Sequence, residues 1–290
     1  MTSTPDEPAP RPSRAGRDLP AAIAVGGGLL ALVVVTLIWW HEGFIALLVV
    51  MTCLGAIEVH HALLQIGMRS AIVPIVIGNI AIVGGSYAAA RLQPVTTIPW
   101  HSVLLGTLGI TVMLALIWRM PGGAKGYVKD AAASLFTISY IPLLASFIGL
   151  ILAMPNGAWK VVAFALCVVG SDTGGYAVGA TLGRHPMAPN ISPKKTWEGM
   201  AGSVVLSVAV GIVAVILLLD QPWWLGVVLA LVAVVFGTAG DLIESLIKRD
   251  VGIKDMSSFL PGHGGVMDRL DSVLVAFPAA WLAYTLLGIA

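Results

Sequence analysis

The sequence predicts an all-α polytopic membrane protein with about nine transmembrane helices. Of its 290 residues, 58% are hydrophobic and only 11% are charged, and the mean hydropathy is +0.93. Apolar runs of about 20 residues recur, which is the length a helix needs to cross a hydrocarbon core roughly 30 Å thick. No segment shows the apolar–polar alternation that the strands of a membrane β-barrel require.

We expect three parts along the chain. Residues 1–19 are polar and rich in proline, which predicts a disordered cytoplasmic tail. Residues 20–160 carry the N-terminal transmembrane helices. Residues 161–290 form a second transmembrane region with long polar cytoplasmic loops, and we expect it to be catalytic. The run 21–40 lacks an obvious small-residue cleavage site, so it is expected to be a retained span.

Hydropathy places the spans in order along the chain. They lie at 21–40, 44–64, 71–90, 101–118, 132–153, 159–178, 201–219, 223–247 and 271–289. Gly and Pro within several of them are ordinary for membrane helices. Pro74 and Pro142 are expected to kink their helices.

The basic residues sort to one side of these spans. If the chain crosses nine times, 14 of the 16 Lys and Arg residues fall on the side of the N-terminus, and only Arg91 and Lys160 on the other. Because cytoplasmic loops are enriched in Lys and Arg, the N-terminus is expected in the cytoplasm and the C-terminus outside. The loops 179–200 and 248–270 then face the cytoplasm from a cell membrane, either an inner or a plasma membrane.

Three polar clusters lie at cytoplasmic ends of spans. Their sequences are GSDTGGY at 170–176, SPKKTWEG at 192–199, and a longer cluster from 240 to 271. Charge near a bilayer is costly, so such clusters are candidates for a functional site.

Helical spacing organises the third cluster. Asp241, Glu244 or Ser245, and Lys248 recur at intervals of three and four residues, so they share one helix face. Asp268 and Asp271 are likewise one turn apart at the start of the last span. Two helix ends can therefore aim carboxylates at a common point.

Asp172 is a third contributor to this expected acidic site. Carboxylates without nearby Cys or paired His suit Mg²⁺ rather than zinc. Cations surround them in the sequence: Lys194, Lys195, Lys248, Arg249, Lys254 and Arg269. Metal and fixed cations together are suited to holding phosphate groups, and the pairs Gly174-Gly175 and Gly264-Gly265 allow backbone N–H groups close to an anion.

Structural roles are the alternative for each acidic residue. Asp268 can cap the last helix, Asp241 and Glu244 can pair with Lys248 and Arg249, and Asp172 can cap a helix or line a polar gap. These roles do not explain why all three clusters lie on one side of the membrane.

Other polar residues have alternatives of their own. Arg119, Lys125 and Lys129 can bind anionic lipid headgroups. His263 is expected to stabilise a turn or contact phosphate. Glu58, with His60 and His61 beside it, lies in the second span, where we expect structural pairing ahead of a catalytic role.

The stretch 245–271 resembles the defining motif of the phosphatidate cytidylyltransferases, also called CDP-diacylglycerol synthases. The matching positions are Ser245, Lys248-Arg249, Lys254-Asp255, Pro261, His263-Gly264-Gly265, Asp268-Arg269 and Asp271. The clusters at 171–176 and 192–199 also look like blocks of that family. The resemblance is strong over about 165–275, and the first 160 residues share only their apolar spans.

The resemblance implies a Mg²⁺-dependent nucleotidyltransferase of phospholipid biosynthesis, which joins CTP and phosphatidate to give CDP-diacylglycerol and pyrophosphate. It implies a homodimer among membrane lipids, with a polar cavity open to the cytoplasm and to lipid; no nucleic-acid partner is expected. Asp241, Asp268 and Asp172 are the implied ligands of one or two metal ions. The expected catalytic residues are Asp172, Asp241, Asp268, Lys248 and Arg249. The expected substrate-binding residues are Ser171, Lys194, Lys195, Ser245, Lys254, His263, Gly264, Gly265 and Arg269.

Two other classes of protein compete with this interpretation. A CTP-dependent lipid kinase, or a cytidylyltransferase for another lipid phosphate, can use a similar site. A transporter or channel can also place charges in apolar spans, but it needs ionisable groups near the midplane and on both sides. Here these groups crowd one face.

Overall fold

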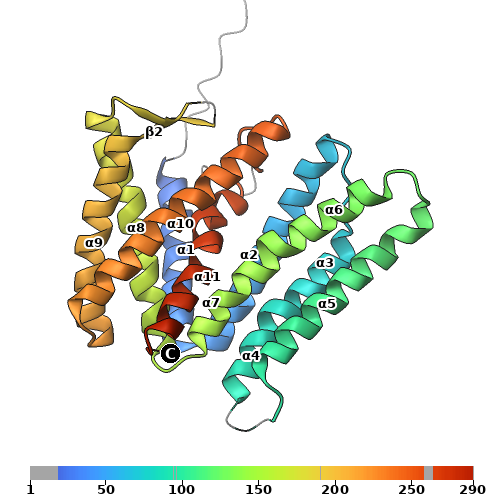
Figure 1. Ribbon diagram of the computed structural model, residues 1–290, viewed down its shortest axis with the longest axis horizontal. Coiled ribbons are helices and arrows are strands. Elements are labelled where there is room, and N and C mark those ends of the chain that lie inside the picture. Colours follow the sequence, from blue (N-terminus) through green and yellow to red (C-terminus); the bar gives the residue numbers. More distant parts are fainter. Residues whose placement is uncertain (1–18, 94, 96, 190, 258–263, 290) are drawn as a thin grey trace, which may run out of the picture.

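The protein forms a bundle of helices with one small hairpin at its end (Figure 1). The computed structural model describes residues 19–93, 95, 97–189, 191–257 and 264–289. The predicted disordered tail falls almost entirely outside the described residues, and α1 begins at Leu19.

Each of the nine predicted spans corresponds to a helical segment of the described chain. The uninterrupted helices are α1 (Leu19–Trp39), α2 (His41–Gln65), α5 (Trp100–Arg119), α8 (Gly157–Leu182), α9 (Trp197–Leu219), α10 (Trp223–Asp250) and α11 (Met267–Leu286). The third span is α3 (Ile72–Asn79), a π turn η1 (Ile80–Gly84) and α4 (Gly85–Leu92). The fifth is α6 (Tyr127–Ile138), a π turn η3 (Ser139–Leu143) and α7 (Leu144–Leu152). A short 3₁₀ turn, η2 (Met120–Gly122), follows α5.

The membrane character of the fold is confirmed. Seven helices of the described chain are long and apolar enough to cross a bilayer, namely the second to the eighth predicted spans. In the first span, the apolar helix Gly26–Trp39 is shorter than these seven, and α11 carries the charged residues Asp268, Arg269 and Asp271 near its start. The count of nine and the orientation of the termini stay predictions.

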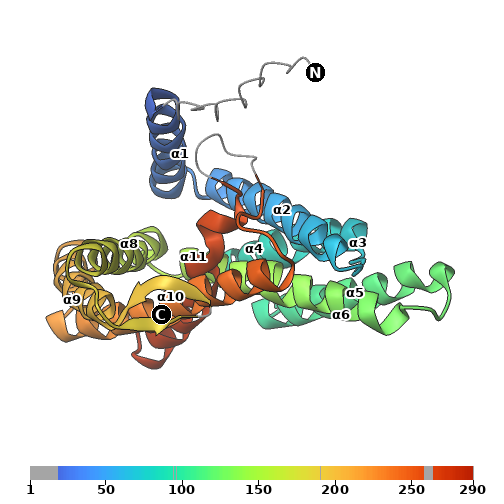
Figure 2. The same cartoon turned by 90° about the horizontal axis from the view of Figure 1, so that it is seen from above.

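The helices form two groups that meet along α11. Helices α8, α9, α10 and α11 pack together on one side, and α2 to α7 lie on the other (Figures 1 and 2). Helix α11 also packs against α7 and α2, so it joins the groups. Helix α1 lies to one side, beside α2 (Figure 2). Of the two prolines expected to kink their helices, Pro142 lies inside the π turn η3 and Pro74 lies in the first turn of α3. The kinks themselves stay predictions.

Small residues bring α8 and α9 into close contact. A Cβ atom on Gly174 would come within 2.9 Å of the carbonyl carbon of Gly202, so neither helix tolerates a side chain here. The hydroxyl of Ser203 donates a hydrogen bond to the carbonyl of Ser171 at 2.7 Å. Membrane helices associate through such small residues and interhelical hydrogen bonds. This packing fixes the end of α8 that carries Asp172.

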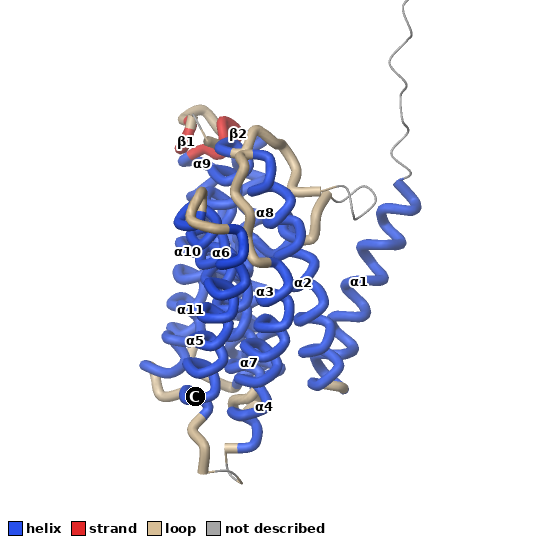
Figure 3. The backbone as a smooth tube through the Cα atoms, turned by 90° about the vertical axis from the view of Figure 1, so that its right-hand side faces the viewer, coloured by secondary structure: helices blue, strands red, loops and turns tan. Residues whose placement is uncertain are grey.

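A β-hairpin connects α8 to α9. Strands β1 (Pro186–Ala188) and β2 (Ser192–Thr196) pair antiparallel, with Pro186 opposite Thr196. The hairpin lies at the same end of the molecule as the C-terminal end of α10, and the marked C-terminus lies at the other end (Figures 1 and 3).

Candidate active site

A cavity of about 320 Å³ with charged and hydroxyl side chains in its lining opens at the hairpin end of the molecule. It is lined by residues of α8, the hairpin, α9 and α10, among them Ser171, Asp172, Lys194, Lys195 and Asp241. All five were expected in the site from the sequence. They come from the three separate polar clusters, and the fold brings the clusters together at one cavity.

Local hydrogen bonds hold the hairpin over this cavity. Thr196 caps α9, accepting a hydrogen bond from the backbone N–H of Gly199 at 3.1 Å. The carboxylate of Glu198 accepts the backbone N–H groups of Arg184 and His185 at 3.1 and 3.2 Å. The motif SPKKTWEG therefore starts α9 and, through Glu198, ties that helix to the start of the hairpin whose second strand carries Lys194 and Lys195.

Lys195 forms an ion pair with Asp241, which links β2 to α10. The two side chains are partly exposed, at 22% and 38%. Asp172 lies near enough for its charge to interact with Asp241 and with Lys195. Three of the predicted residues thus form one electrostatic group in the lining of the cavity.

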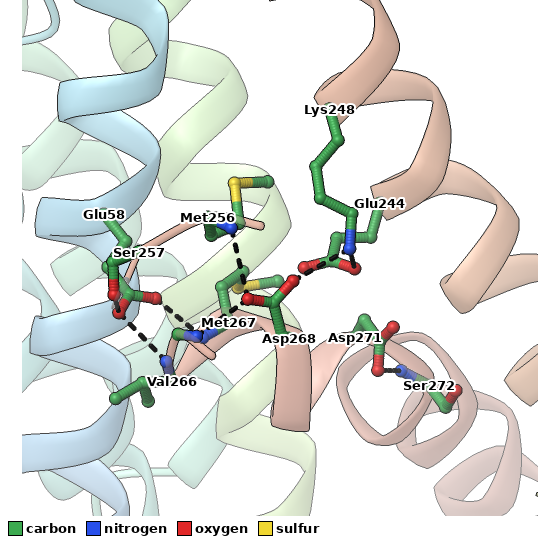
Figure 4. A network of polar contacts seen from close by, with 11 residues as sticks. Glu58, Glu244, Lys248, Met256, Ser257, Val266, Met267, Asp268, Asp271 and Ser272 are labelled. Carbon is green, nitrogen blue, oxygen red and sulfur yellow. Dashed lines mark hydrogen bonds and ion pairs between the residues drawn. The ribbon is translucent and has the colours of Figure 1, made fainter. Parts of the chain in front are cut away.

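A second, more buried group lies between α10 and α11 (Figure 4). Lys248 pairs with Glu244 one turn earlier on α10 and with Oδ1 of Asp268 on α11, the latter at 2.8 Å. The side chains are 15%, 1% and 11% exposed for Lys248, Glu244 and Asp268. The helix face predicted for Glu244 and Lys248 is confirmed by this contact between residues four positions apart.

Asp268 also shapes the loop before α11. Its Oδ2 accepts the backbone N–H groups of Gly265 at 2.8 Å and Met256 at 3.1 Å. Gly264 has a φ of +80°, and a Cβ there would lie 3.0 Å from Oδ2 of Asp268. The glycine is therefore needed for both its backbone conformation and the space it leaves.

Asp271 connects the two groups. Its charge interacts with those of Asp241 and Lys248, and also with that of Asp172. Gly240 makes this possible, because a Cβ at Gly240 would overlap the carbonyl oxygen of Asp271. We expected the carboxylates of α10 and α11 to point at one common position. They instead form a row of acidic residues, in which Asp241 and Asp268 pair with different lysines.

Two buried polar atoms at this row have no hydrogen-bond partner among the described residues. One is Oε1 of Glu244 and the other is the hydroxyl of Tyr140 in η3. Tyr140 lies near enough for its hydroxyl to interact electrostatically with Glu244, Asp271 and Asp241. Buried polar groups are nearly always hydrogen-bonded, so an acceptor and a donor left over at one site indicate a polar ligand or water there.

Glu58 of α2 reaches the same region from the other helix group (Figure 4). Its carboxylate accepts the backbone N–H groups of Val266 at 2.9 Å and Met267 at 2.8 Å, and the hydroxyl of Ser257 at 2.5 Å. The structural pairing expected for Glu58 is thus found, with the loop and first turn of α11 as its partners. His60 makes a separate contact with Ser70, at 2.7 Å.

The remaining predicted residues are placed less centrally. Arg249 and Lys254 are exposed, and Arg269 is exposed in the first turn of α11. Ser245 is half-buried on α10. His263 lies outside the described residues. Arg119 pairs with Asp130 at 2.5 Å, away from the cavity.

The donor set fits a divalent cation. Five carboxylates gather at this end of the molecule, from Asp172, Asp241, Glu244, Asp268 and Asp271. Among the described residues, Lys195 pairs with Asp241, and Lys248 pairs with Glu244 and Asp268. Oε1 of Glu244 is buried and accepts no hydrogen bond from the described residues, so it adds an available ligand atom. Hard oxygen ligands of this kind are those that Mg²⁺ prefers. In the described part of the chain, no three Asp, Glu, His or Cys side chains converge on a single point as they stand.

Four residues of the site were not among the catalytic and binding residues predicted from the sequence: Glu58, Tyr140, Glu244 and Asp271. Glu244 and Asp271 carried a detectable signal, because they share helix faces with Asp241, Lys248 and Asp268. Glu58 carried a weaker signal, as an acidic residue within the second span, but its partners come from a distant helix and could not be predicted. Tyr140 carried no signal, because it reaches the site only through tertiary packing.

The chain is similar to known proteins over nearly all its length. Residues 21–287 match the profile of the cytidylyltransferase family. A phosphatidate cytidylyltransferase of Mycobacterium bovis is 38% identical over 297 residues, covering 97% of this chain and 93% of that protein. One of Mycobacterium leprae is 39% identical over 292 residues, covering 94% and 90%. One of Staphylococcus saprophyticus is 37% identical over 150 residues, covering 51% and 57%.

Proposed function

This chain belongs to the cytidylyltransferase family, and we propose that it transfers the CMP group of CTP to phosphatidate, giving CDP-diacylglycerol and pyrophosphate. Its similarity to phosphatidate cytidylyltransferases over almost the whole of both chains supports this assignment. The structural observation that carries the proposal is the row of five carboxylates beside a lysine-lined cavity, where Glu244 Oε1 and the Tyr140 hydroxyl have no hydrogen-bond partner among the described residues.

The reaction needs no general base from the protein. Phosphatidate ends in a phosphate monoester that carries about −1.5 to −2 charges at pH 7, because its second pKa is near 6. One of its oxygens attacks the α-phosphorus of CTP, the bond from that phosphorus to the bridging oxygen of the β-phosphate breaks, and pyrophosphate leaves. The obstacle is repulsion between two anions, and this is what the cations of the site offset.

The basic residues have separable tasks in this proposal. Lys194 and Lys195 line the cavity and bind the triphosphate of CTP. Lys248 lies between Glu244 and Asp268, where it fixes both carboxylates. Arg249, Lys254 and Arg269 lie around the same end of α10 and α11 and add positive charge for the phosphate of the lipid.

The acidic residues are proposed to hold Mg²⁺. Asp241 and Asp268 are the proposed ligands, with Asp172 as a third, and Glu244 and Asp271 lie beside them. When bound, one or two Mg²⁺ ions supply the charge that offsets the repulsion between the phosphates of the two substrates. Lys195 and Lys248 hold the carboxylates in place and limit their mutual repulsion.

The location of the site follows from the sorting of basic residues. We propose that the hairpin end faces the cytoplasm, because loops rich in Lys and Arg lie on that side of membrane proteins. CTP then enters from the cytoplasm and pyrophosphate leaves into it, while the acyl chains of phosphatidate stay in the bilayer. We also propose that the enzyme acts as a homodimer.

The position of a radioactive label separates this proposal from a CTP-dependent lipid kinase. Purified protein is incubated with phosphatidate, Mg²⁺ and CTP labelled at either the α- or the γ-phosphorus. A cytidylyltransferase moves the α-label into lipid and releases the γ-label as pyrophosphate. Transfer of the γ-label to lipid, with release of CDP, would instead identify a kinase.

A further inference from the structure

Glu58 contacts the motif segment 245–271, although it lies on a helix that carries none of the three polar clusters of the site. It lies in α2 and is 6% exposed. Three hydrogen bonds reach its carboxylate within the described residues, and all three donors belong to the segment that contains Asp268. A buried carboxylate is costly unless its oxygens are hydrogen-bonded, so these contacts explain why it is tolerated in a span.

Two of these donors are the backbone N–H groups of Val266, the N-cap of α11, and of Met267, its first residue. A helix begins with N–H groups that have no partner within the helix, and a negative charge beside them is favourable. Helix α11 has no side-chain cap of its own at Val266. The carboxylate of Glu58 supplies the missing acceptors at Val266 and Met267 from another helix.

The contact of Glu58 with Val266 and Met267 also fixes Asp268, the next residue of the chain. Asp268 comes directly after Met267, and it holds the N–H of Gly265 while its other oxygen pairs with Lys248. Glu58 and Asp268 thus accept hydrogen bonds from neighbouring peptide groups of a single turn (Figure 4). Any rotation of this turn would move the carboxylate of Asp268 away from Lys248.

Gly265 shows how closely Glu58 approaches this turn. A Cβ atom at Gly265 would lie 2.8 Å from Oε2 of Glu58 and 3.0 Å from its carboxyl carbon. Ser257, on the other side of residues 258–263, donates to Oε1. Glu58 therefore holds the chain on both sides of that segment.

We propose that Glu58 is a positioning residue for Asp268, acting from α2 through the first turn of α11. The proposal rests on the function proposed above, because it takes Asp268 as a ligand of the divalent cation. It predicts that the two helix groups must be docked for the site to bind the ion at its proper strength.

The test compares Glu58→Gln with Glu42→Gln in full-length protein purified in lipid nanodiscs. Glu42 is an exposed acid in the first turn of the same helix, so it is a matched control for loss of charge. Gln keeps one carbonyl acceptor but presents an N–H₂ group to donors on its other side. Gly265→Ala is a second variant, which displaces the same contact from the opposite partner.

Three measurements are made on each variant. Hydrogen–deuterium exchange reports protection of the backbone at 264–271 and elsewhere. Turnover of CTP is measured as a function of Mg²⁺ concentration. Thermal unfolding reports the stability of the whole protein.

Glu58→Gln and Gly265→Ala are expected to lose exchange protection at 264–271 alone. They should need more Mg²⁺ for half-maximal turnover, by about 10- to 100-fold, which is the range found for groups that orient metal ligands. Glu42→Gln should match the unmodified protein in all three measurements.

Two results would overturn the proposal. One is an unchanged Mg²⁺ requirement with unchanged protection at 264–271 in Glu58→Gln. The other is loss of protection throughout the chain with an unchanged Mg²⁺ requirement, which would make Glu58 a residue of general stability. If the unmodified protein transferred no CMP, the proposed function would fail separately, and the exchange data would still report whether Glu58 holds the turn.

Discussion

Lys248 and Asp268 are joined at 2.8 Å across two helices, although twenty positions separate them in the chain. Lys248 also pairs with Glu244 on its own helix, so one ammonium group serves two largely buried carboxylates. This contact fixes the start of α11 against the end of α10. It places Asp268 and Asp271 beside the acidic residues of α10.

Replacing Lys248 by Met should destabilise the protein strongly. The change leaves Glu244 and Asp268 buried without their shared cation, and breaking a buried ion pair from one side costs about 3–5 kcal/mol. The apparent unfolding temperature in nanodiscs would measure this loss. Lys125→Met, at an exposed position of another loop, should have little effect.

Adding Glu244→Gln to Lys248→Met should recover part of the stability, because it removes one uncompensated charge. If the double variant is no more stable than Lys248→Met, then Glu244 is not held by Lys248 in the folded protein.

Lys194→Ala should raise the Michaelis constant for CTP or phosphatidate and leave the folded protein intact. Lys194 is exposed and lines the cavity, so its loss removes charge from the site without opening a buried contact. Initial rates at varied concentrations of each substrate measure the effect, with Lys125→Ala as the control. Unchanged constants for both substrates would place Lys194 outside the site.

Gly240→Ala should force α10 and α11 apart. Its new methyl group would overlap the carbonyl oxygen of Asp271 and lie 3.0 Å from Cα of Ser272. Overpacking of this kind costs about 1–3 kcal/mol, and we expect activity to fall with it because the acidic row is displaced. Gly106→Ala is the matched control, since outside its chain neighbours and its own helix backbone no atom of the described residues lies within 4 Å of a Cβ there. Normal activity and stability in Gly240→Ala would contradict the close approach.

Tyr140→Phe should separate activity from stability. The buried hydroxyl has no partner in the described part of the chain, so its removal should not lower the unfolding temperature. If it donates to an anionic substrate, a hydrogen bond of about 1.5–3 kcal/mol is lost, and kcat/KM falls about ten- to hundredfold.

Tyr127→Phe is the control for Tyr140→Phe, because its effects on stability and activity should be the opposite. The Tyr127 hydroxyl donates to the carbonyl of Leu116 at 3.1 Å, away from the cavity, so this variant should lose stability and keep its activity. Full activity in Tyr140→Phe would exclude a contact between that hydroxyl and the substrate.

The sequence could predict what periodicity and apolar length encode. Runs of apolar residues located the helices, and the spacing of Glu244 and Lys248 predicted a shared face that the ion pair confirms. The gathering of Asp172, Lys195 and Asp241 at one cavity was also expected, from their position at the same ends of spans.

Tertiary contacts could not be predicted from helical periodicity or from the length of apolar runs. The pairing of Lys195 with Asp241 depends on how the β-hairpin folds over α8, which no helical period encodes. The hydrogen bonds from Val266 and Met267 to Glu58 join residues more than 200 positions apart. The close packing at Gly240 depends on the crossing of two helices, so the glycine in the sequence gave no sign of its partner.

Transfer of α-labelled CMP into lipid by purified Asp241→Asn and Asp268→Asn tests the assignment of the site most directly. Asp220→Asn is the control, because Asp220 is exposed in the turn after α9 and its left-handed φ of +51° suits Asn. We expect a loss of more than about a hundredfold in both site variants, beyond the cost of groups that only orient a metal ligand, while the protein still inserts in the membrane. Near-normal transfer by Asp268→Asn would contradict the assignment of the site.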